Sequence, residues 1–185
     1  GKTAVFLHVI RHVLTVGKGV IVTVPEISLT PQTLAVFTAA FGDTVAVFHS
    51  GLSVGERMDE WKRVRTGKAK IVVGTRSAVF APVQNLGLIV MDEEQESTYK
   101  SESTPRYHAR DIAKFRVNYN RAYCLLCSAT PSVESYYMAQ SGKYRYHALH
   151  HRYGDAVVPT VQLVDMNNED LYRGKPMISM ALARA

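Results

Sequence analysis

A regular alternation of short apolar runs with helical patterns is the feature that most constrains how this chain can fold. Five apolar runs bounded by Gly, Pro or polar residues are typical of buried strands, and they lie at residues 19–24, 44–48, 70–73, 86–91 and 122–126. Helical patterns lie at residues 4–14, 30–41, 53–65, 105–117 and 132–140. The alternation predicts an α/β fold in which helices cover both faces of a parallel sheet.

Capping signals mark the start of two of these helices. Thr30 is expected to be an N-cap residue, with Pro31 at the first helical position. Ser53 and Glu56 have the spacing of a capping box. Both signals predict a helix that begins shortly after a strand ends.

The composition is that of a globular protein of about one domain. The chain has 185 residues, of which 46% are hydrophobic and 21% are charged. No apolar stretch approaches the roughly 20 residues of a membrane span, and no secretory signal pattern is present. We therefore expect a cytoplasmic protein that does not bind a membrane. The net charge of +6 mildly favours a polyanionic partner, although Lys and Arg are spread along the chain.

Cysteine and histidine clusters do not indicate a metal site. Cys124 and Cys127 form a Cys-x-x-Cys pattern within an apolar run, but residues three apart in a strand point to opposite faces. We expect both to be reduced, buried thiols. His147, His150 and His151 lie together without an acid or cysteine nearby, so we expect them on the surface.

Residues that directly follow the strands carry the chemistry, because ligands of parallel α/β sheets bind beyond the carboxyl ends of the strands. The fourth run is followed by Asp92-Glu93-Glu94-Gln95, and Gly1-Lys2-Thr3 precedes the first helix. A Lys and a hydroxyl at a helix N-terminus suit phosphates and Mg²⁺. We expect Asp92 to hold the metal and Glu93 to activate water, as in an ATP-hydrolysing lobe. The alternative is that the acids only cap the turn after the strand.

Both ends of the sequence are expected to be internal to a longer protein. A complete phosphate loop has a Gly and four further residues before Gly-Lys-Thr, and the chain begins at the last Gly. We expect an ATP-binding motor lobe at residues 1–143 and, at residues 144–185, an exit segment toward another domain. Within that segment we expect a short strand at 161–164 and the start of a helix at 178.

The segment from Tyr99 to Tyr107 interleaves aromatic and basic residues directly after the acids. Bases can stack on Tyr99 and Tyr107 while Lys100 and Arg106 follow the backbone of single-stranded DNA. The alternative is a helix N-terminus with buried tyrosines.

Further strings of polar, glycine and proline residues lie after the expected strands or between them. They are Val24-Pro25-Glu26-Ile27, Leu29-Thr30-Pro31-Gln32, His49-Ser50-Gly51-Leu52-Ser53, Gly74-Thr75-Arg76-Ser77-Ala78-Val79-Phe80-Ala81-Pro82, Pro105-Arg106-Tyr107-His108-Ala109-Arg110-Asp111 and Ser128-Ala129-Thr130-Pro131-Ser132. With the acids and Lys2, these strings resemble superfamily 2 helicases and, within them, the PriA family of bacterial replication-restart DNA helicases. The resemblance covers residues 1 to about 165, and the two longest strings are the most specific.

The resemblance implies the first of two RecA-like motor lobes, a P-loop NTPase fold that binds ATP and Mg²⁺. It implies that Lys2 contacts the β and γ phosphates, that Thr3 and Asp92 hold Mg²⁺, and that Glu93 activates water. The other nucleotide-side residues that it implies are Gly1, Gln95, Ser128 and Thr130, the last two linking the nucleotide to the DNA side. The DNA-contacting residues, with the aromatic segment included, are Pro25, Thr30, Gln32, Thr75, Arg76, Tyr99, Lys100, Arg106 and Tyr107.

The resemblance also implies the activity, an ATP-dependent 3′ to 5′ DNA helicase or translocase that acts in replication restart and primosome assembly. Implied partners are single-stranded and forked DNA, with primosome and single-strand-binding proteins in the full-length context. Zinc is implied only for a cysteine-rich part that this chain does not include. Without the arginine finger of the second lobe, the piece is expected to be weakly active. Gln95 stands where the family usually has His, and an amide can bridge the γ-phosphate region to Ser128 but cannot carry a proton.

Two other functions stay open. The chain can belong to another superfamily 2 translocase, such as a RecG-like or restriction-system motor. It can also be a docking module for DNA or protein without catalysis, although the presence of Lys2, Asp92 and Glu93 argues against this.

Overall fold

The computed structural model describes residues 2–149, 161–167 and 178–184. By their contacts, the residues divide into two units, Gly1–Leu149 and His150–Ala185. The expected surface residues His150 and His151 lie outside the described residues. In the second unit, α6 (Met180–Arg184) agrees with the expected helix. The expected strand at 161–164 is wrong, because these residues are irregular and Leu163 is 96% exposed, with no paired strand among the described residues.

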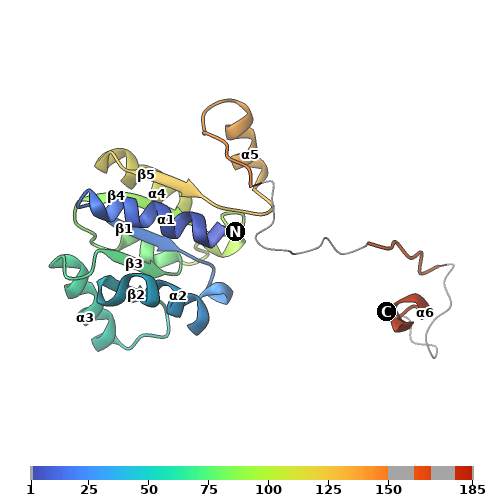
Figure 1. Ribbon diagram of the computed structural model, residues 1–185, viewed down its shortest axis with the longest axis horizontal. Helices are drawn as coiled ribbons and strands as arrows, with labels where there is room; N and C mark the ends of the chain where they lie inside the picture. The colour runs from blue at the N-terminus through green and yellow to red at the C-terminus, as the bar shows by residue number, and fades with distance from the viewer. Residues whose placement is uncertain (1, 150–160, 168–177, 185) are drawn as a thin grey trace. The chain divides into compact units, whose positions relative to one another are not determined.

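The first unit is built on a five-stranded parallel sheet (Figure 1). Its strand order is β2-β3-β1-β4-β5, so β1 lies at the centre. All four neighbouring pairs are parallel, which confirms the expected sheet. The strands are β1 (Gly19–Thr23), β2 (Val45–Phe48), β3 (Ile71–Gly74), β4 (Leu86–Met91) and β5 (Tyr123–Leu126).

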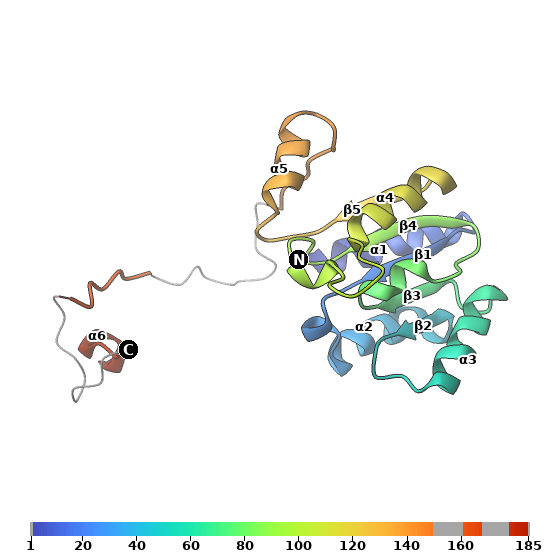
Figure 2. The same cartoon turned by 180° about the vertical axis from the view of Figure 1, so that it is seen from behind.

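Helices cover both faces of this sheet (Figures 1 and 2). Side chains of α1 and α2 pack with Val20 and Val22 on one face, while the neighbouring Ile21 packs on the other face with residues of α3 and α4. This division follows from the two-residue period of a strand. The covering helices are α1 (Lys2–Thr15), α2 (Pro31–Phe41), α3 (Val54–Arg65) and α4 (Ala109–Asn120), and α5 (Val133–Gln140) follows β5.

Short 3₁₀ turns, which the sequence patterns did not predict, follow several strands. They lie at η1 (Glu26–Ser28), η2 (Gly42–Thr44), η3 (Arg76–Phe80) and η4 (Ser97–Tyr99). Three of them, η1, η3 and η4, follow β1, β3 and β4 at the carboxyl edge of the sheet, so they form part of the surface around the candidate site.

Both predicted caps are present. The side chain of Thr30 accepts a hydrogen bond from the Thr33 N–H, with Pro31 at the first helical position. Ser53 and Glu56 form a complete capping box at the start of α3. One helix start is wrong, because α4 begins at Ala109 and not at residue 105. Residues 105–108 belong instead to a loop whose two ends pair through an antiparallel bridge between Lys100 and His108.

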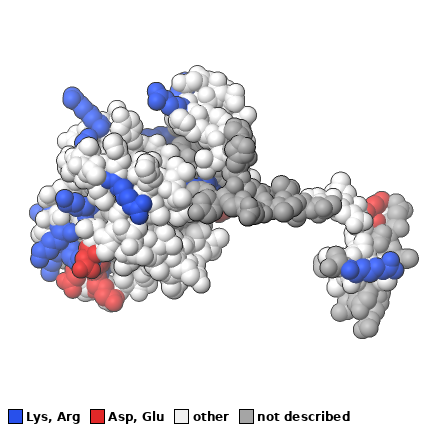
Figure 3. All heavy atoms as spheres, viewed as in Figure 1, with Lys and Arg blue, Asp and Glu red and all other residues white. Residues whose placement is uncertain are grey.

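The two cysteines face opposite sides of the sheet, as the strand period predicts, but both are half-buried instead of buried as expected. Cys124 packs with the α3 and α4 face, and Cys127, directly after β5, packs with the opposite face. Burial raises the pKa of Cys124 to about 11 and that of Cys127 to about 12, so both thiols stay protonated at neutral pH. Among the described residues, no group of three or more His, Cys, Asp and Glu could hold a metal ion. No described helix is long and apolar enough to cross a bilayer. On the face seen in Figure 3, Lys and Arg are spread without forming one block.

Candidate functional site

The acids after β4 form a tight turn between the ends of two other strands. The Asp92 N–H donates to the Thr23 carbonyl at 2.9 Å, and the Glu94 N–H donates to the Cys127 carbonyl at 3.0 Å. Glu93, which lies between these two hydrogen-bonded residues, adopts a φ of 46°. Its N–H donates to Asp92 Oδ1 at 3.1 Å. A non-glycine residue with positive φ is uncommon, and such a conformation persists where the surrounding structure enforces it.

Lys2 reaches this acidic turn from the first turn of α1. Its Nζ lies 2.5 Å from Glu93 Oε1 and 3.9 Å from Asp92 Oδ1, and all three side chains are between 20% and 31% exposed. Thr3 and Asp92 line one hollow of about 240 Å³. The structure therefore brings together Lys2, Thr3, Asp92 and Glu93, as the sequence predicted. Gly1 lies outside the described residues.

The two adjacent carboxylates have opposite pKa shifts. Burial raises the pKa of Asp92, and the charge of Lys2 opposes this only in part. Burial also acts to raise the pKa of Glu93, but the hydrogen bonds from Lys2 and Gln95 outweigh it, so the pKa of Glu93 lies below its ordinary value. Glu93 is therefore ionised at neutral pH and can accept a proton.

A chain of hydrogen bonds leads from Glu93 to the loop after β5. Gln95 donates from Nε2 to Glu93 Oε2 at 3.0 Å, and Ser128 Oγ donates to Gln95 Oε1 at 2.6 Å. The N–H of Thr130 then donates to Ser128 Oγ at 2.9 Å. The amide of Gln95 thus uses its donor and its acceptor at once. The bond to Ser128 is the one that the sequence predicted, while the other partner is the Glu93 carboxylate.

The third acid, Glu94, has a role that the sequence did not indicate. Its side chain is 1% exposed and accepts a hydrogen bond from Arg110 Nη1 at 3.1 Å. It also accepts from the Ser132 N–H at 2.7 Å and from Ser135 Oγ at 2.9 Å. Arg110 Nε is buried and has no hydrogen-bond partner among the described residues. The predicted N-terminus of a helix at Ser132 was the one available signal, since carboxylates favour such positions.

Tyr99 is buried, contrary to the expected stacking role. The residue is 1% exposed, and its hydroxyl lies 2.6 Å from the Asp92 carbonyl oxygen and 2.9 Å from that of Thr23. A buried ring presents no face to a base, so its position does not support DNA stacking. The physical reason is that η4 directs the Tyr99 side chain into the core, where its hydroxyl bonds to the carbonyl oxygens of Asp92 and Thr23.

The other residues that were predicted to contact DNA differ in how exposed they are. Thr75 is 4% exposed and Pro25 is also buried, so neither offers much surface. Thr30 is occupied as a helix cap. Lys100, Arg106 and Gln32 are exposed, and these three can reach a ligand directly.

Arg76 and Tyr107 are half-buried and hold the loop of residues 100–108. The guanidinium of Arg76 donates to the carbonyl oxygens of Thr98 and Lys100, at 3.0 and 2.7 Å. It also lies 6.0 Å from the centre of the Tyr107 ring, and that ring packs edge-on against Phe80. Arg76 therefore uses one nitrogen within the protein and leaves the rest of the guanidinium for a further contact.

Comparisons with known proteins agree with this arrangement. The family model for the DEAD/DEAH box helicase matches residues 1–139. The chain is 50% identical over 182 residues to the replication restart protein PriA of Bacillus subtilis, and the match covers 98% of this chain and 23% of that protein. It is 46% identical over 187 residues to PriA of Chlamydia trachomatis, which covers 100% of this chain and 25% of that protein. The chain thus spans about a quarter of the length of these relatives.

A solved structure, the C-terminal domain of the DEAD-box protein Dbp5, is 17% identical with a TM-score of 0.45, covering 69% of this chain and 72% of that one. The resemblance to PriA that the strand-end strings indicated is confirmed by the relatives. The parallel sheet with helices on both faces has the RecA-like architecture of a helicase lobe. With the family model matching more than half of its residues, the chain belongs to the DEAD/DEAH box helicase family.

Proposed function

We propose that residues 1–143 form the ATP-binding motor lobe of a PriA-like DNA helicase and that residues 144–185 lead toward a second lobe. The observation that carries the proposal is the meeting of Lys2 with Asp92 and Glu93 at the carboxyl edge of the sheet. The full activity would be ATP-driven 3′ to 5′ movement on DNA in replication restart and primosome assembly. The relatives are named replication restart protein PriA, and these names support the part of the proposal that concerns replication restart.

Lys2 would bind the β and γ phosphates of ATP. Its ammonium group lies at the N-terminus of α1, where backbone N–H groups and the helix dipole favour anions. Its present partners are carboxylates, which a triphosphate can replace as the counter-charge. Release of Lys2 would then leave Glu93 free to accept another hydrogen bond.

Thr3 and Asp92 fit Mg²⁺ as ligands. A hydroxyl and a carboxylate are the hard oxygen donors that Mg²⁺ prefers, and both residues line the same hollow. Mg²⁺, when bound, supplies charge neutralisation for the phosphates. The backbone of Asp92 is fixed in position because its N–H donates to the carbonyl of Thr23 at the end of β1.

Glu93 would take the proton of the attacking water. Its lowered pKa keeps the carboxylate ionised at neutral pH, and Gln95 fixes its orientation through Oε2. The bond from Ser128 to Gln95 would transmit the position of this carboxylate to the loop after β5. Gln95 acts here as an orienting amide and not as a proton carrier.

Single-stranded and forked DNA would lie against the exposed residues of the carboxyl edge. Gln32, Lys100 and Arg106 are exposed there, and contacts from such side chains to phosphates and sugars do not depend on base sequence. Primosome and single-strand-binding proteins are proposed partners of the full-length protein. A lobe without an arginine finger would turn over more slowly by about 10³ to 10⁵.

ATP hydrolysis by the full-length protein, with and without single-stranded DNA, tests the proposal. Lys2→Ala is expected to abolish binding of an ATP analogue and to lower kcat by at least about 100-fold, in the range of lost transition-state contacts. Lys68→Ala is the matched control, because this exposed lysine precedes β3 and so lies at the edge of the sheet opposite to the acids. Hydrolysis that survives Lys2→Ala would overturn the proposal, and strand displacement on substrates with opposite overhangs would decide the polarity.

A further inference from the structure

The amino edge of the sheet, opposite to the acids, carries a row of basic and amide residues. The row consists of Lys70 directly before β3, Lys18 directly before β1, Asn85 directly before β4 and Arg121 shortly before β5. These strands are neighbours in the order β3-β1-β4-β5, so the four residues follow one another along the edge. Neighbouring strands lie about 4.8 Å apart, and the row therefore extends over about 14 Å.

Backbone hydrogen bonds fix the positions of this row. The Lys70 N–H donates to the Thr44 carbonyl at 2.9 Å, and the Gly19 N–H donates to the Asn85 carbonyl at 3.0 Å. The side chain of Asn85 donates from Nδ2 to the Gly17 carbonyl at 3.2 Å, which leaves its oxygen as the outward group. The sheet thus holds the backbone of the row in place before any ligand binds.

The row carries positive charge that the first unit does not neutralise. Lys18, Lys70 and Arg121 have no carboxylate partner among the residues that the structure describes. Arg65, exposed at the end of α3, adds a further charge beside the row. Asp43 is an exposed acid before β2, next to the Lys70 end, so the positive charge is greatest from β1 to β5.

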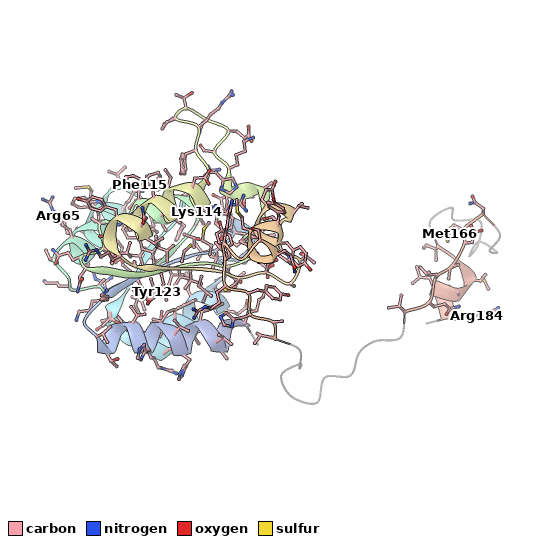
Figure 4. The ribbon with its side chains drawn as sticks, turned by 90° about the horizontal axis from the view of Figure 1, so that it is seen from above. Arg65, Lys114, Phe115, Tyr123, Met166 and Arg184 are labelled. Atoms are coloured by element: carbon pink, nitrogen blue, oxygen red, sulfur yellow. The ribbon has the colours of Figure 1, made fainter. Side chains whose placement is uncertain are left out.

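Two exposed tyrosines flank the β5 end of the row. Tyr119, in the last turn of α4, is 81% exposed, and Tyr123, the first residue of β5, is 78% exposed. The neighbouring Cys124 packs on the α4 face, so Tyr123 points to the opposite face. Figure 4 shows Arg65 and Tyr123 at the same end of the first unit. The two tyrosine rings therefore do not form one stacking surface.

These side chains match the phosphate backbone of duplex DNA. Lys, Arg, Asn and Tyr all bind phosphate oxygens, and such contacts do not depend on base sequence. A duplex is stiff over about 150 bp, so it stays straight against an edge of this length. Single-stranded DNA is typically held by a groove with successive aromatic rings, which the two separated tyrosines do not provide.

We infer that the amino edge of the sheet is a second DNA-binding surface, which holds the backbone of a duplex arm of forked DNA through Lys18, Lys70 and Arg121. The inference goes beyond the proposed function, which places DNA only at the carboxyl edge. β4, which runs from one edge to the other, has six residues, so about 20 Å separate the edges. The lobe thus holds two arms of one fork at once.

The experiment measures binding of the full-length protein to blunt duplex DNA and to oligo-dT by fluorescence anisotropy. Lys18→Gln/Lys70→Gln removes two charges and is expected to lower the slope of log Kd against log salt by about 1.8 for the duplex, at about 0.9 per phosphate contact. Between about 50 and 200 mM salt, the parent Kd should then rise about tenfold more than that of the variant. The Kd for oligo-dT should stay within about twofold, because the carboxyl edge is unchanged.

The matched control is Arg11→Gln/Lys62→Gln, which also removes two charges. Arg11 lies over the ring of Phe41 and Lys62 lies near the carboxylate of Asp59, so both already have partners within the protein. This variant is expected to keep the parent slope for the duplex. An equal fall of the slope in both variants would show a general effect of net charge and would overturn the inference.

Lysine acetylation read by mass spectrometry is the second measurement. Lys18 and Lys70 are expected to be modified in the free full-length protein and to be protected by duplex DNA but not by oligo-dT. Protection without DNA would overturn the inference, because another part of the protein would then cover this edge. If Lys18→Gln/Lys70→Gln does not fold, this labelling decides alone.

Three further results would overturn the inference. One is an unchanged duplex slope in Lys18→Gln/Lys70→Gln, with or without a lower Tm, since the lysines would then have at most a structural role. Another is a matching loss of oligo-dT affinity. The third is a variant that keeps the duplex slope but loses affinity for poly-glutamate, because the edge would then bind an acidic peptide.

Failure of the proposed function gives a different result. Hydrolysis that survives Lys2→Ala overturns the proposed function and leaves the salt slope for the duplex untouched. A parent that loses hydrolysis in Lys2→Ala, while Lys18→Gln/Lys70→Gln keeps the parent slope for the duplex, overturns this inference alone.

Discussion

Lys2 Nζ lies 2.5 Å from Glu93 Oε1, although 91 positions separate the two residues in the chain. The contact joins the first turn of α1 to the turn after β4. It is possible because α1 packs on β1 and β4 through Phe6, Ile10 and Val13, which are buried. The apolar face of one helix thus delivers an amine to a carboxylate at the edge of the sheet.

Replacement of Lys2 by Met is expected to raise the pKa of Glu93. The hydrogen bond and charge of Lys2 now hold that pKa below its ordinary value against the effect of burial. In the parent, this lowered pKa contributes stability that is present above pH 4.5 and is lost as the pH falls through the folded pKa. Carboxyl NMR titration checks the shift, with Lys68→Met as the control. An unchanged Glu93 titration would contradict the contact.

Asp92→Asn is expected to raise the Tm at pH 7. Burial raises the pKa of Asp92, so its charged form destabilises the folded state, while Asn keeps an oxygen for the Glu93 N–H. A raised folded pKa means that stability is fully present below the unfolded value of 3.8 and is lost as the pH rises through the folded pKa. The gain in Tm should therefore shrink on acidification. Thermal unfolding at several pH values measures this, and Asp59→Asn, at an exposed acid, should show no such trend.

Glu94→Ala is expected to destabilise the protein by about 3 to 5 kcal/mol, because it leaves the guanidinium of Arg110 buried without its counter-charge. The loss should be visible as a lower urea midpoint with an unchanged m-value. Glu102→Ala, at an exposed position in the loop, is the control and should change stability by less than about 0.5 kcal/mol. A small effect of Glu94→Ala would mean that Arg110 finds other partners.

Gly74→Ala is expected to destabilise the protein by about 1 to 3 kcal/mol through overpacking. A Cβ at Gly74, the last residue of β3, would meet the carbonyl oxygen of Phe48 and lie 2.8 Å from Ala78 Cβ. Gly55→Ala in α3 provides the opposite case, because a Cβ there has nothing within 4 Å, and the change should stabilise by about 0.4 to 1 kcal/mol. Chemical denaturation of both variants compares the signs, and a stable Gly74→Ala protein would show that β2 can move away.

Local patterns predicted most elements of the first unit but not the loop before α4. The patterns of β1, β4 and the capping box of α3 depend on neighbouring residues, and they were correct. The start of α4 was wrong because residues 105–108 carry helix-compatible side chains, yet His108 forms an antiparallel bridge with Lys100. Pairing between separate segments outweighs local propensity at such positions.

The amino-acid sequence alone determined the alternating strands and helices, the acidic residues at a strand end, and the lysine at the start of α1, because each depends on residue type and short-range spacing. Only the tertiary structure decided which way each acid faces. Glu93 points to Lys2 while Glu94 points inward to Arg110, and the Tyr99 hydroxyl contacts the carbonyl oxygen of Asp92. These directions follow from one left-handed residue and from contacts between distant segments, whose energies no local pattern contains.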